Sequence, residues 1–327
     1  MSQLKGKNIL VTGGAGFIGS NLIEYLLNNE NQVTCLDNFS TGKPENLDAF
    51  SKNPLFTMIE GDIRNLEDCR KAVTGCDLVY HQAALGSVPR SIKDPITTNE
   101  VNIGGFLNML TASRDEKVQR FIYAASSSTY GDHPGLPKYE DRIGRPLSPY
   151  AVTKYVNELY ANVFADLYGL ETIGLRYFNV FGRKQDPNGA YAAAIPKFIK
   201  LLINHQSPVV YGDGEQSRDF TYIDNVIQAN ELAGLVTGPE AVNQVYNVAF
   251  GEKTTVNQLI DYLREGLSQF DSHILTIPTE YTSIRKGDIL HSLASVEKAE
   301  RLLGYRPQYN LRNGIKKAIE WYFHSLK

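Results

Sequence analysis

Cysteine is scarce in this sequence, and its scarcity excludes several kinds of protein. Only three cysteines occur in 327 residues, Cys35, Cys69 and Cys76. They form neither a Cys-x-x-Cys pair nor a metal-type cluster, so we expect no disulfide scaffold and no metal site. Free cysteines in this number indicate a reducing compartment.

An excess of charge of one sign and long apolar runs are lacking too. The 33 Lys and Arg residues nearly balance the 36 Asp and Glu residues, which leaves a net charge of −3. This balance predicts neither a nucleic-acid partner nor a membrane-surface partner. No apolar run approaches the roughly 18 residues that span a bilayer, and the first residues lack the apolar segment of a signal peptide. We therefore expect a cytoplasmic protein.

The residues that are present are typical of a folded globular chain. Hydrophobic residues make up 42% and charged residues 21% of the sequence, which excludes disordered, collagen-like and coiled-coil classes. At about 150 residues per domain, the length predicts about two domains.

Short apolar runs alternate with helical patterns in the first half. The runs, which suit buried parallel strands, cover residues 8–12, 33–36, 56–59, 77–81, 120–125 and 172–177. The helical patterns between them cover residues 17–27, 66–73, 99–113 and 151–167. This alternation predicts an α/β protein with a parallel sheet covered by helices on both faces.

The residue composition changes after Asn179, where Gly, Pro and Asp cluster. Helical patterns follow at residues 194–203, 223–235, 256–267, 296–303 and 312–323, without a clean linker. We therefore predict a first domain over residues 1–180 and a smaller α/β substrate lobe over 181–327, interleaved with the first and separated from it by a cleft.

A glycine-rich loop lies between the first predicted strand and helix. Gly13, Gly16 and Gly19 are spaced as GxxGxxG, which lets the backbone turn sharply and approach a pyrophosphate at a helix N-terminus. Asp37 follows the second predicted strand, where an acidic residue accepts the 2′-hydroxyl of an adenosine ribose. The pattern predicts a Rossmann-type doubly wound sheet that binds NAD in preference to NADP.

A Tyr-x-x-x-Lys sequence and three serines are candidates for the chemistry. Tyr150 and Lys154 are four apart, so on a helix they share a face. An ammonium near a phenol stabilises the phenolate and lowers its pKa, although the same spacing also occurs in solvated helix pairs. Ser126, Ser127 and Ser128 follow the fifth predicted strand, where they form either a polar turn or a site for a substrate hydroxyl.

These motifs together resemble a known family. TGGAGFIGS, LDNFSTG, GDIR, HQAA, SSSTYGDHP, SPYAVTK and LRYFNVFG are similar to the extended short-chain dehydrogenase/reductases, and within them to the nucleotide-sugar 4-epimerases. HQAALGSVPRSI and NGAYAAAIPKF most resemble bacterial UDP-N-acetylglucosamine 4-epimerases of surface-polysaccharide pathways. The resemblance covers nearly the whole chain. It implies tightly bound NAD, a UDP-sugar substrate and C4 epimerisation through a 4-keto intermediate.

The resemblance also implies roles for individual residues at the cofactor. Tyr150 would be the catalytic acid and base, and Lys154 would bind the nicotinamide ribose and depress the Tyr150 pKa. Ser126 matches the catalytic serine, although a slip of the alignment selects Ser127 or Ser128. The other implied cofactor contacts are Phe17, Ile18, Asp37, Asn38, Ser40, Thr41 and Gly42 around the adenosine, Asp62 and Ile63 at the adenine, Gln82, Ala83 and Ala84 in the middle, and Tyr177 at the nicotinamide.

On the substrate side, the resemblance places basic and polar residues around the nucleotide and the sugar. Ser126, Ser127 and Ser87 would lie near the sugar, as would Arg90. Asn179, Arg218 and Arg285 would hold the diphosphate, and Asp288 the uridine ribose; Arg suits this because its fork pairs with phosphate oxygens. Ser292 stands where strict UDP-glucose epimerases carry a bulky tyrosine, so an N-acetyl group would have room.

The sequence also bears on functions other than C4 epimerisation of UDP-N-acetylglucosamine. UDP-glucuronate decarboxylases carry Glu where this chain has Ser128, and 4,6-dehydratases carry Asp-Glu in place of Ser127 and Ser128, so the sequence argues against both. A 4-epimerase of UDP-N-acetylglucosaminuronate remains open, because Arg90 could serve a carboxylate. Non-catalytic NAD-binding sensors usually lack the Tyr or the Lys, both of which are present here.

The helical patterns at 99–113 and 151–167 carry apolar residues on more than one face. An intramolecular core explains this, and so does association of two copies. In the family that the chain resembles, the matching helices form a homodimer through a four-helix bundle, so we expect a homodimer.

Overall fold

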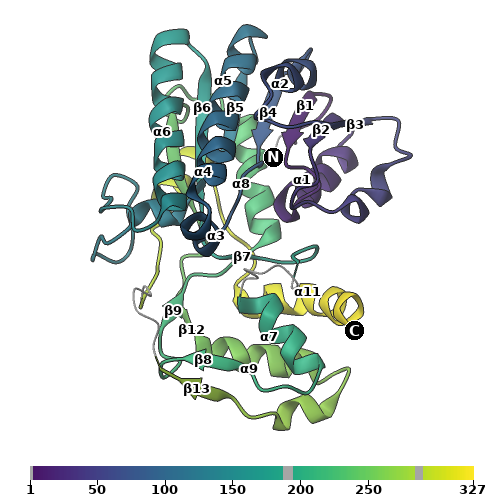
Figure 1. Cartoon of the computed structure of the whole chain (residues 1–327), viewed down its shortest axis with the longest axis vertical. Helices are drawn as coiled ribbons and strands as arrows, with labels where there is room; N and C mark the ends of the chain where they lie inside the picture. Colours follow the sequence, from purple (N-terminus) through teal and green to yellow (C-terminus); the bar gives the residue numbers. More distant parts are fainter. Residues whose placement is uncertain (1–2, 187–193, 284–289) are drawn as a thin grey trace.

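The computed structural model describes residues 3–186, 194–283 and 290–327. Figure 1 shows a large body that contains the N-terminus and a smaller lobe below it that contains the C-terminus. The chain passes between body and lobe more than once, and α8 (Ile223–Leu235) and β11 (Gln244–Val248) of its second half lie in the body.

A seven-stranded parallel sheet forms the centre of the body. Its strands run in the order β11-β6-β5-β4-β1-β2-β3, and every pairing is parallel. This confirms the predicted α/β class and the doubly wound, Rossmann-type sheet. The strand bounds are β1 Asn8–Thr12, β2 Gln32–Asp37, β3 Phe56–Glu60, β4 Leu78–His81, β5 Arg120–Ser126, β6 Glu171–Tyr177 and β11 Gln244–Val248.

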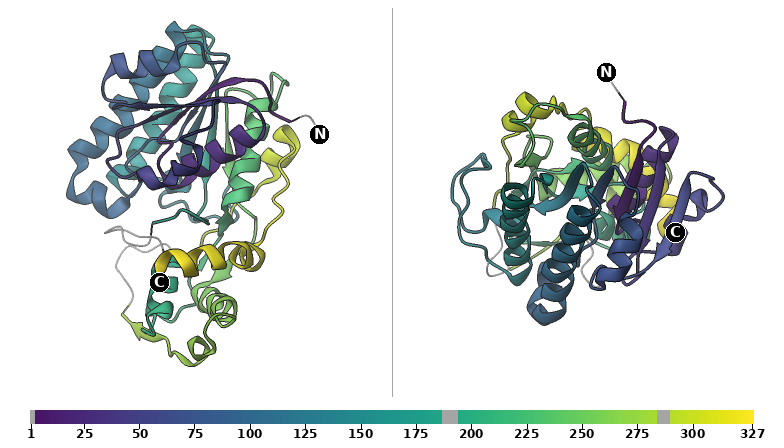
Figure 2. Two further views of the ribbon diagram at one scale, coloured as in Figure 1. Left: turned by 90° about the vertical axis from the view of Figure 1, so that its right-hand side faces the viewer. Right: turned by 90° about the horizontal axis from the view of Figure 1, so that it is seen from above.

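Helices cover both faces of this sheet (Figure 2). The helices α1 (Phe17–Asn28) and α8 (Ile223–Leu235) share one hydrophobic core with the sheet, which includes Leu22 and Val226. The helices α2 (Leu66–Val73), α5 (Phe106–Asp115) and α6 (Pro149–Tyr168) share the core on the other face, which includes Phe121. The order of the strands reverses between β4 and β1, and such a switch point is where ligands bind in open parallel sheets.

The seventh strand, β11, was not predicted from the sequence. Its five residues, Gln-Val-Tyr-Asn-Val, form neither an apolar run nor a strict alternation, and Asn247 within it is fully buried. Asn247 is satisfied by partners distant in sequence, since its amide donates to Lys138 O and Ser295 O, each at 2.9 Å. Both α8 and β11 come from the second half of the chain but belong to the body.

The helix predicted over residues 99–113 is divided in the structure. It consists of α4 (Pro95–Asn99), a π-helical turn (Glu100–Gly105) and α5. The predicted helix over residues 99–113 is therefore confirmed, with a π-helical turn inside it. A π-helical turn adds a residue to the helical repeat and redirects side chains, and here the buried Asn102 lies within it.

The lobe is built from helices and short strand pairs. Its helices are α7 (Ala194–Ile203), α9 (Val256–Leu267) and α11 (Leu311–Leu326), while α10 (Glu297–Leu303) packs on β11. The short strand pairs are β7 (Val180–Phe181) with β10 (Thr221–Tyr222), β8 (Val209–Tyr211) with β13 (Glu280–Thr282), and β9 (Ser217–Arg218) with β12 (Thr254–Thr255). The remaining short elements are α3 (Val88–Lys93) and the single turns Pro44–Asn46, Asp48–Phe50, Ser127–Tyr130 and Ser272–Thr276.

Candidate active site

The predicted glycine loop joins β1 to α1 at the switch point of the sheet. Gly13 has a φ of 68°, and its N–H donates to Leu36 O at 2.8 Å. A Cβ at Gly13 would lie 2.7 Å from the backbone of Ala83, and one at Gly19 would lie 2.2 Å from Gly13 O. The first turn of α1 has no side-chain cap, so its N–H groups are available to an anion.

Asp37 ends β2 beside this loop. One carboxylate oxygen accepts from the N–H of Ala15 at 2.9 Å, and the other accepts from the N–H of Phe39 at 2.8 Å. Burial raises the pKa of Asp37, and these backbone hydrogen bonds act in the opposite direction. The carboxylate is therefore held in one orientation, with lone pairs left for the hydroxyls of a ribose.

These residues line one large cavity of about 630 Å³, a size that suits a cofactor. The glycine loop leaves open a space that Cβ atoms would fill, and this space fits a pyrophosphate. The Asp37 carboxylate beside it fits the ribose of a dinucleotide. The predicted residues that line it are Gly13, Gly16, Phe17, Ile18, Gly19, Asp37, Asn38, Ser40, Thr41, Gly42, Asp62, Ile63, Gln82, Ala83 and Ala84, together with Ser87 and Arg90.

The predicted adenine end of the cavity is ordered by polar contacts. The amide of Asn38 donates to the Asp62 carboxylate at 2.9 Å. Arg64 forms an ion pair with the same carboxylate at 2.6 Å, and its hydrogen bond lowers the pKa of Asp62 to about 2. Asp62 is therefore an ionised acceptor at neutral pH.

Residues that the sequence analysis missed complete this cavity. Lys43, Lys184 and Asp186 line it, and Lys43 pairs with Asp186 at 3.1 Å. Gln185 lines it as well and also lines a second cavity. These residues come from loops with no motif, so nothing in a single sequence indicates them.

Tyr177 ends β6 and is held from two sides. Its hydroxyl accepts from Asn230 Nδ2, on α8, at 3.0 Å, and its proton has two acceptors within reach, Gln82 Oε1 and Asn230 Oδ1, each at 3.2 Å. Burial raises the pKa of Tyr177 to about 12. Tyr177 is thus a neutral hydroxyl, and Asn230, a fully buried residue of the second half, is a further missed member of the site.

Asn102 links the cavity to the catalytic helix. Its side chain accepts from the N–H of Leu85 at 2.7 Å and donates to Thr153 Oγ1 at 3.1 Å. Thr153 in turn donates to Tyr150 O at 2.8 Å. The sequence gives no signal for this role, because Asn102 lies in a helical pattern with no neighbouring motif.

Tyr150 and Lys154 lie at the start of α6. Ser148 caps this helix by accepting from the N–H of Ala151 at 3.1 Å. The Lys154 ammonium is buried and donates to Ala124 O at 2.8 Å, and burial lowers its pKa to about 8. The four-residue spacing places both side chains on one face of the helix, as predicted.

The expected lowering of the Tyr150 pKa by Lys154 is not found. Burial raises the pKa of Tyr150, and its hydrogen bond with Ser126 is what lowers it. The reason is geometric, since Lys154 points one turn deeper, to the carbonyl of Ala124 on β5.

The three serines lie in two different structural elements, the end of β5 and the turn that follows it. Ser126 ends β5, and its Oγ accepts from both the N–H and the hydroxyl of Ser128, at 3.1 and 2.8 Å. Ser127 and Ser128 belong to the turn that follows. Ser126 is the serine whose side chain lowers the pKa of Tyr150, in opposition to burial.

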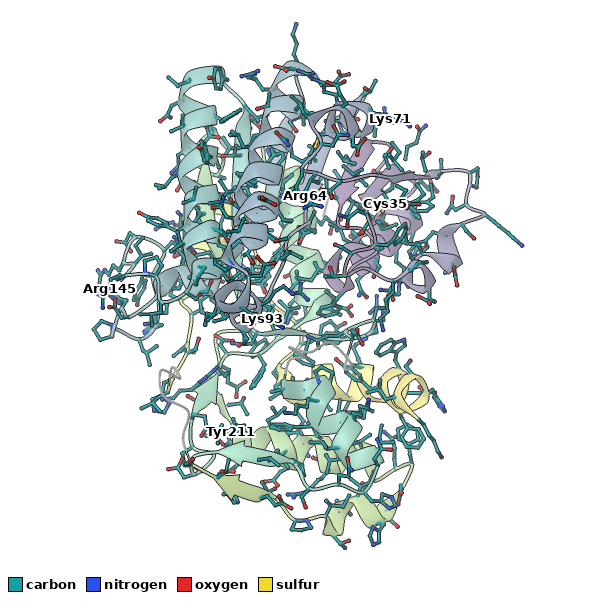
Figure 3. The ribbon with its side chains drawn as sticks, viewed as in Figure 1. Cys35, Arg64, Lys71, Lys93, Arg145 and Tyr211 are labelled. Carbon is teal, nitrogen blue, oxygen red and sulfur yellow. The ribbon has the colours of Figure 1, made fainter. Side chains whose placement is uncertain are left out.

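A second cavity of about 310 Å³ opens in the lobe and adjoins the first through Gln185. Asn179 and Arg218 line it, as does Tyr211, which Figure 3 places in the lobe. The Arg218 guanidinium donates to Ser217 O and Leu290 O. Ser292 is close by, because its N–H donates to Ser217 O at 3.1 Å. The predicted Arg285 and Asp288 lie outside the described residues.

The described residues contain neither a metal-binding group nor a membrane-spanning helix. Over residues 3–186, 194–283 and 290–327, no group of three or more His, Cys, Asp or Glu side chains is arranged to hold a metal ion. Within the same ranges, no helix combines the length and the apolar character needed to cross a bilayer.

The switch-point cradle, the acid at the end of β2 and the Tyr150 and Lys154 pair are the features of a dinucleotide-dependent enzyme of the short-chain dehydrogenase/reductase type. A model of the NAD dependent epimerase/dehydratase family matches residues 9–249. The chain belongs to this family, which confirms the predicted NAD dependence.

Solved structures resemble the whole chain. A UDP-N-acetylglucosamine 4-epimerase of Methanobrevibacter ruminantium, in complex with UDP-N-acetylmuramic acid, is 39% identical with a TM-score of 0.91, over 98% of this chain and all of its own. A UDP-glucose 4-epimerase of Thermotoga maritima with UDP-glucose is 36% identical, with a TM-score of 0.89 and the same coverage. A UDP-glucuronic acid 4-epimerase of Bacillus cereus, with UDP-glucuronic acid and NAD, is 32% identical, with a TM-score of 0.87 and again the same coverage.

Proposed function

We propose that this enzyme is a UDP-sugar 4-epimerase that interconverts UDP-N-acetylglucosamine and UDP-N-acetylgalactosamine, and also UDP-glucose and UDP-galactose. The observations that carry the proposal are the interaction of Ser126 with Tyr150, which opposes the rise of the Tyr150 pKa, and a cavity that fits NAD and is linked to α6 through Asn102. The likeness to 4-epimerases over 98% of the chain supports the reaction type.

Tyr150 moves the proton of the sugar 4-hydroxyl. NAD, when bound, accepts a hydride from C4 of the sugar and returns it. Burial makes the phenolate the minor form of Tyr150 at neutral pH, and we propose that this form takes the 4-hydroxyl proton while Ser126 donates a hydrogen bond that stabilises it. The 4-keto sugar then rotates, so that the hydride would return to the opposite face of C4 while Tyr150 returns the proton to the O4 oxygen. Lys154 contributes a buried positive charge near this exchange.

The lobe holds the nucleotide while the sugar turns. Arg218 and Asn179 line the second cavity, and we propose that they bind the diphosphate, together with Arg285, with Asp288 on the uridine ribose. Arg suits this role because its guanidinium pairs two oxygens at once. A firm grip on the nucleotide retains the keto intermediate, whereas the sugar pocket stays permissive.

The size of residue 292 is expected to select between sugars. Ser292→Tyr adds a ring where we place the 2-acetamido group, so turnover of UDP-N-acetylglucosamine should fall by at least about 10-fold, which corresponds to a steric cost of over about 1.4 kcal/mol. Turnover of UDP-glucose on the same protein sample serves as the control and should stay within about 2-fold of the native value. Equal losses on both sugars, measured as kcat/KM, would show that residue 292 does not act by volume.

A UDP-uronic acid is the second candidate substrate. Arg90 lies beside Ser87 on the wall of the large cavity, and its cation could pair with a carboxylate on the sugar. The likeness to an enzyme bound to UDP-glucuronic acid favours this alternative. UDP-N-acetylglucosaminuronate is the uronate that we would test first.

A panel of four substrates tests the function. The purified enzyme is incubated with UDP-glucose, UDP-N-acetylglucosamine and the two corresponding uronates, and the products are separated by chromatography. We expect the highest kcat/KM on UDP-N-acetylglucosamine. Preference for a uronate would favour the second candidate, and turnover of none would favour a non-catalytic NAD-binding protein.

We also propose that the enzyme is a homodimer through the outer face of α6. Leu159 and Leu167 on this helix are 47% and 69% exposed, and Ile96 on the neighbouring α4 is 71% exposed. An exposed apolar face of this kind marks a contact surface.

Placing a charge on this face should separate the two copies. Leu159→Lys removes an apolar side chain from both sides of a two-fold interface, about 3 kcal/mol in all, so the dimer should weaken about 100-fold. Sedimentation velocity measures this. Leu275→Lys, at a site 55% exposed in the lobe, is the control and should leave the dimer unchanged. A Leu159→Lys protein that remains dimeric would contradict the proposed interface.

A further inference from the structure

A buried ion pair lies behind Tyr150 and Lys154. Glu158 follows Lys154 by one turn of α6, and its two carboxylate oxygens accept from Arg176 Nε at 2.9 Å and Nη2 at 2.7 Å. The Glu158 and Arg176 side chains are 5% and 4% exposed. Burying two ions is costly even when they are paired, so stability alone does not explain why they are here.

Glu158 joins three elements that carry catalytic groups. Arg176 is on β6, directly before Tyr177, and its guanidinium lies 4.8 Å from the ring centre of Tyr130. The hydroxyl of Thr129, in the turn that begins after Ser126, lies 3.5 Å from Glu158 Oε1. The carboxylate therefore connects the catalytic helix to the sheet and to the serine turn.

Glu158 also supplies negative charge near Lys154. Burial lowers the pKa of Lys154, and the charge of Glu158 raises it. The hydrogen-bond acceptor of the ammonium, Ala124 O, is a neutral carbonyl. An anion one turn away on the same helix face is well placed to stabilise the cation in this apolar setting.

The other titratable groups around Lys154 carry no charge at neutral pH. Burial and the charge of Lys154 lower the pKa of His81, on β4, to about 3, so this imidazole is neutral. Burial raises the pKa of Tyr123, on β5, and that of Tyr150, on α6. Among the described groups that face Lys154, Glu158 is therefore the source of negative charge, and Arg176 is its partner.

We propose that Glu158, oriented by Arg176, is a positioning residue that keeps Lys154 an ammonium at neutral pH and thereby keeps the buried positive charge that Lys154 contributes near the proton exchange of Tyr150. The inference holds for any substrate of the site and rests on the proposed role of Tyr150 and Lys154. It assigns the buried pair to catalysis.

The test measures the protonation of Lys154 directly. The enzyme is labelled with carbon-13 at the lysine Cε, and Lys154→Met identifies the Lys154 signal by its loss. In Glu158→Gln the titration midpoint of Lys154 should move to lower pH by about one unit or more, as expected when a neighbouring opposite charge is removed. An ammonium persists only below its pKa, so the alkaline limb of the kcat profile should move to lower pH as well.

A second variant guards against misfolding. Glu158→Gln leaves Arg176 buried without its partner, which destabilises proteins strongly. The double variant Glu158→Gln with Arg176→Met removes both ions, so the Lys154 titration should still move to lower pH, but by less than in Glu158→Gln, because loss of the Arg176 cation offsets part of the loss of the Glu158 charge. A native Lys154 titration in the folded double variant would overturn the inference, since the pair would then act only through folding.

The same sheet offers a matched control. Arg120, 3% exposed, pairs with Glu171 at 2.6 Å. The two residues are the first of β5 and β6, at the ends of these strands away from Ser126 and Tyr177. Glu171→Gln removes a more exposed carboxylate (39% exposed) that is likewise paired with a buried arginine, and it should leave the Lys154 titration and the pH profile unchanged. The Lys154 titration does not depend on turnover. A protein that epimerises no UDP-sugar would therefore contradict the proposed function, whereas the role of Glu158 would still be decided by the titration.

Discussion

Replacing Tyr150 with Phe is expected to lower kcat for UDP-sugar epimerisation by about 1,000-fold, within the range for loss of a general acid and base. The substitution removes only the hydroxyl, which is hydrogen-bonded to Ser126. The ring still packs at the start of α6, so the helix and the cofactor cavity should keep their shape. The measurement is kcat on UDP-N-acetylglucosamine, with the products separated by chromatography.

The Tyr150→Phe protein should still contain NAD. None of the residues that line the large cavity is changed, so the NAD released on denaturation should equal that of the native protein. Tyr155→Phe, which removes a phenolic hydroxyl five residues later in the same helix, is the matched control and should keep its activity. Normal turnover by Tyr150→Phe would refute the assigned role of Tyr150.

Replacing Gly13 with Ala is expected to produce a protein that purifies without NAD. The backbone at Gly13 has a φ of 68°, a strained conformation for Ala that costs about 1–3 kcal/mol. The new Cβ would also meet the backbone of Ala83 at 2.7 Å, and backbone cannot move aside as a flexible side chain does. The loops after β1 and β4 would separate, and the pyrophosphate cradle would open.

NAD content and thermal unfolding together check this prediction. Gly13→Ala should release no NAD on denaturation and should unfold at a lower temperature than the native protein. Gly104→Ala is the control, because a Cβ there would meet no atom within 4 Å and the backbone φ is not positive. Retention of a full complement of NAD by Gly13→Ala would contradict the assigned role of this loop.

The fold class and most of the cofactor cavity follow from local sequence. A GxxGxxG loop, an acid after the second strand and polar residues after the fourth strand are each local patterns. In a parallel sheet the carboxyl ends of the strands meet at one edge, so these patterns converge whatever the details of packing. Gly13, Asp37 and Gln82 accordingly line the same cavity.

Residues defined by burial and distant partners did not follow from the sequence. Asn230 reaches Tyr177 from α8, and Asn102 reaches Thr153 from a π-helical turn that the helical pattern concealed. An Asn in an amphipathic pattern has the same local signature whether it is solvated or buried. Only contacts between segments far apart in the chain distinguish the two.

The sequence by itself determined the NAD-binding α/β fold, the candidate pair of Tyr150 and Lys154 and the group of serines, because each depends on spacing within one element or one turn. The tertiary structure decided which serine meets Tyr150, where the Lys154 ammonium points and which strand completes the sheet. Those outcomes depend on direction and burial in three dimensions, and burial determines how far a charge acts and which protonation state it favours.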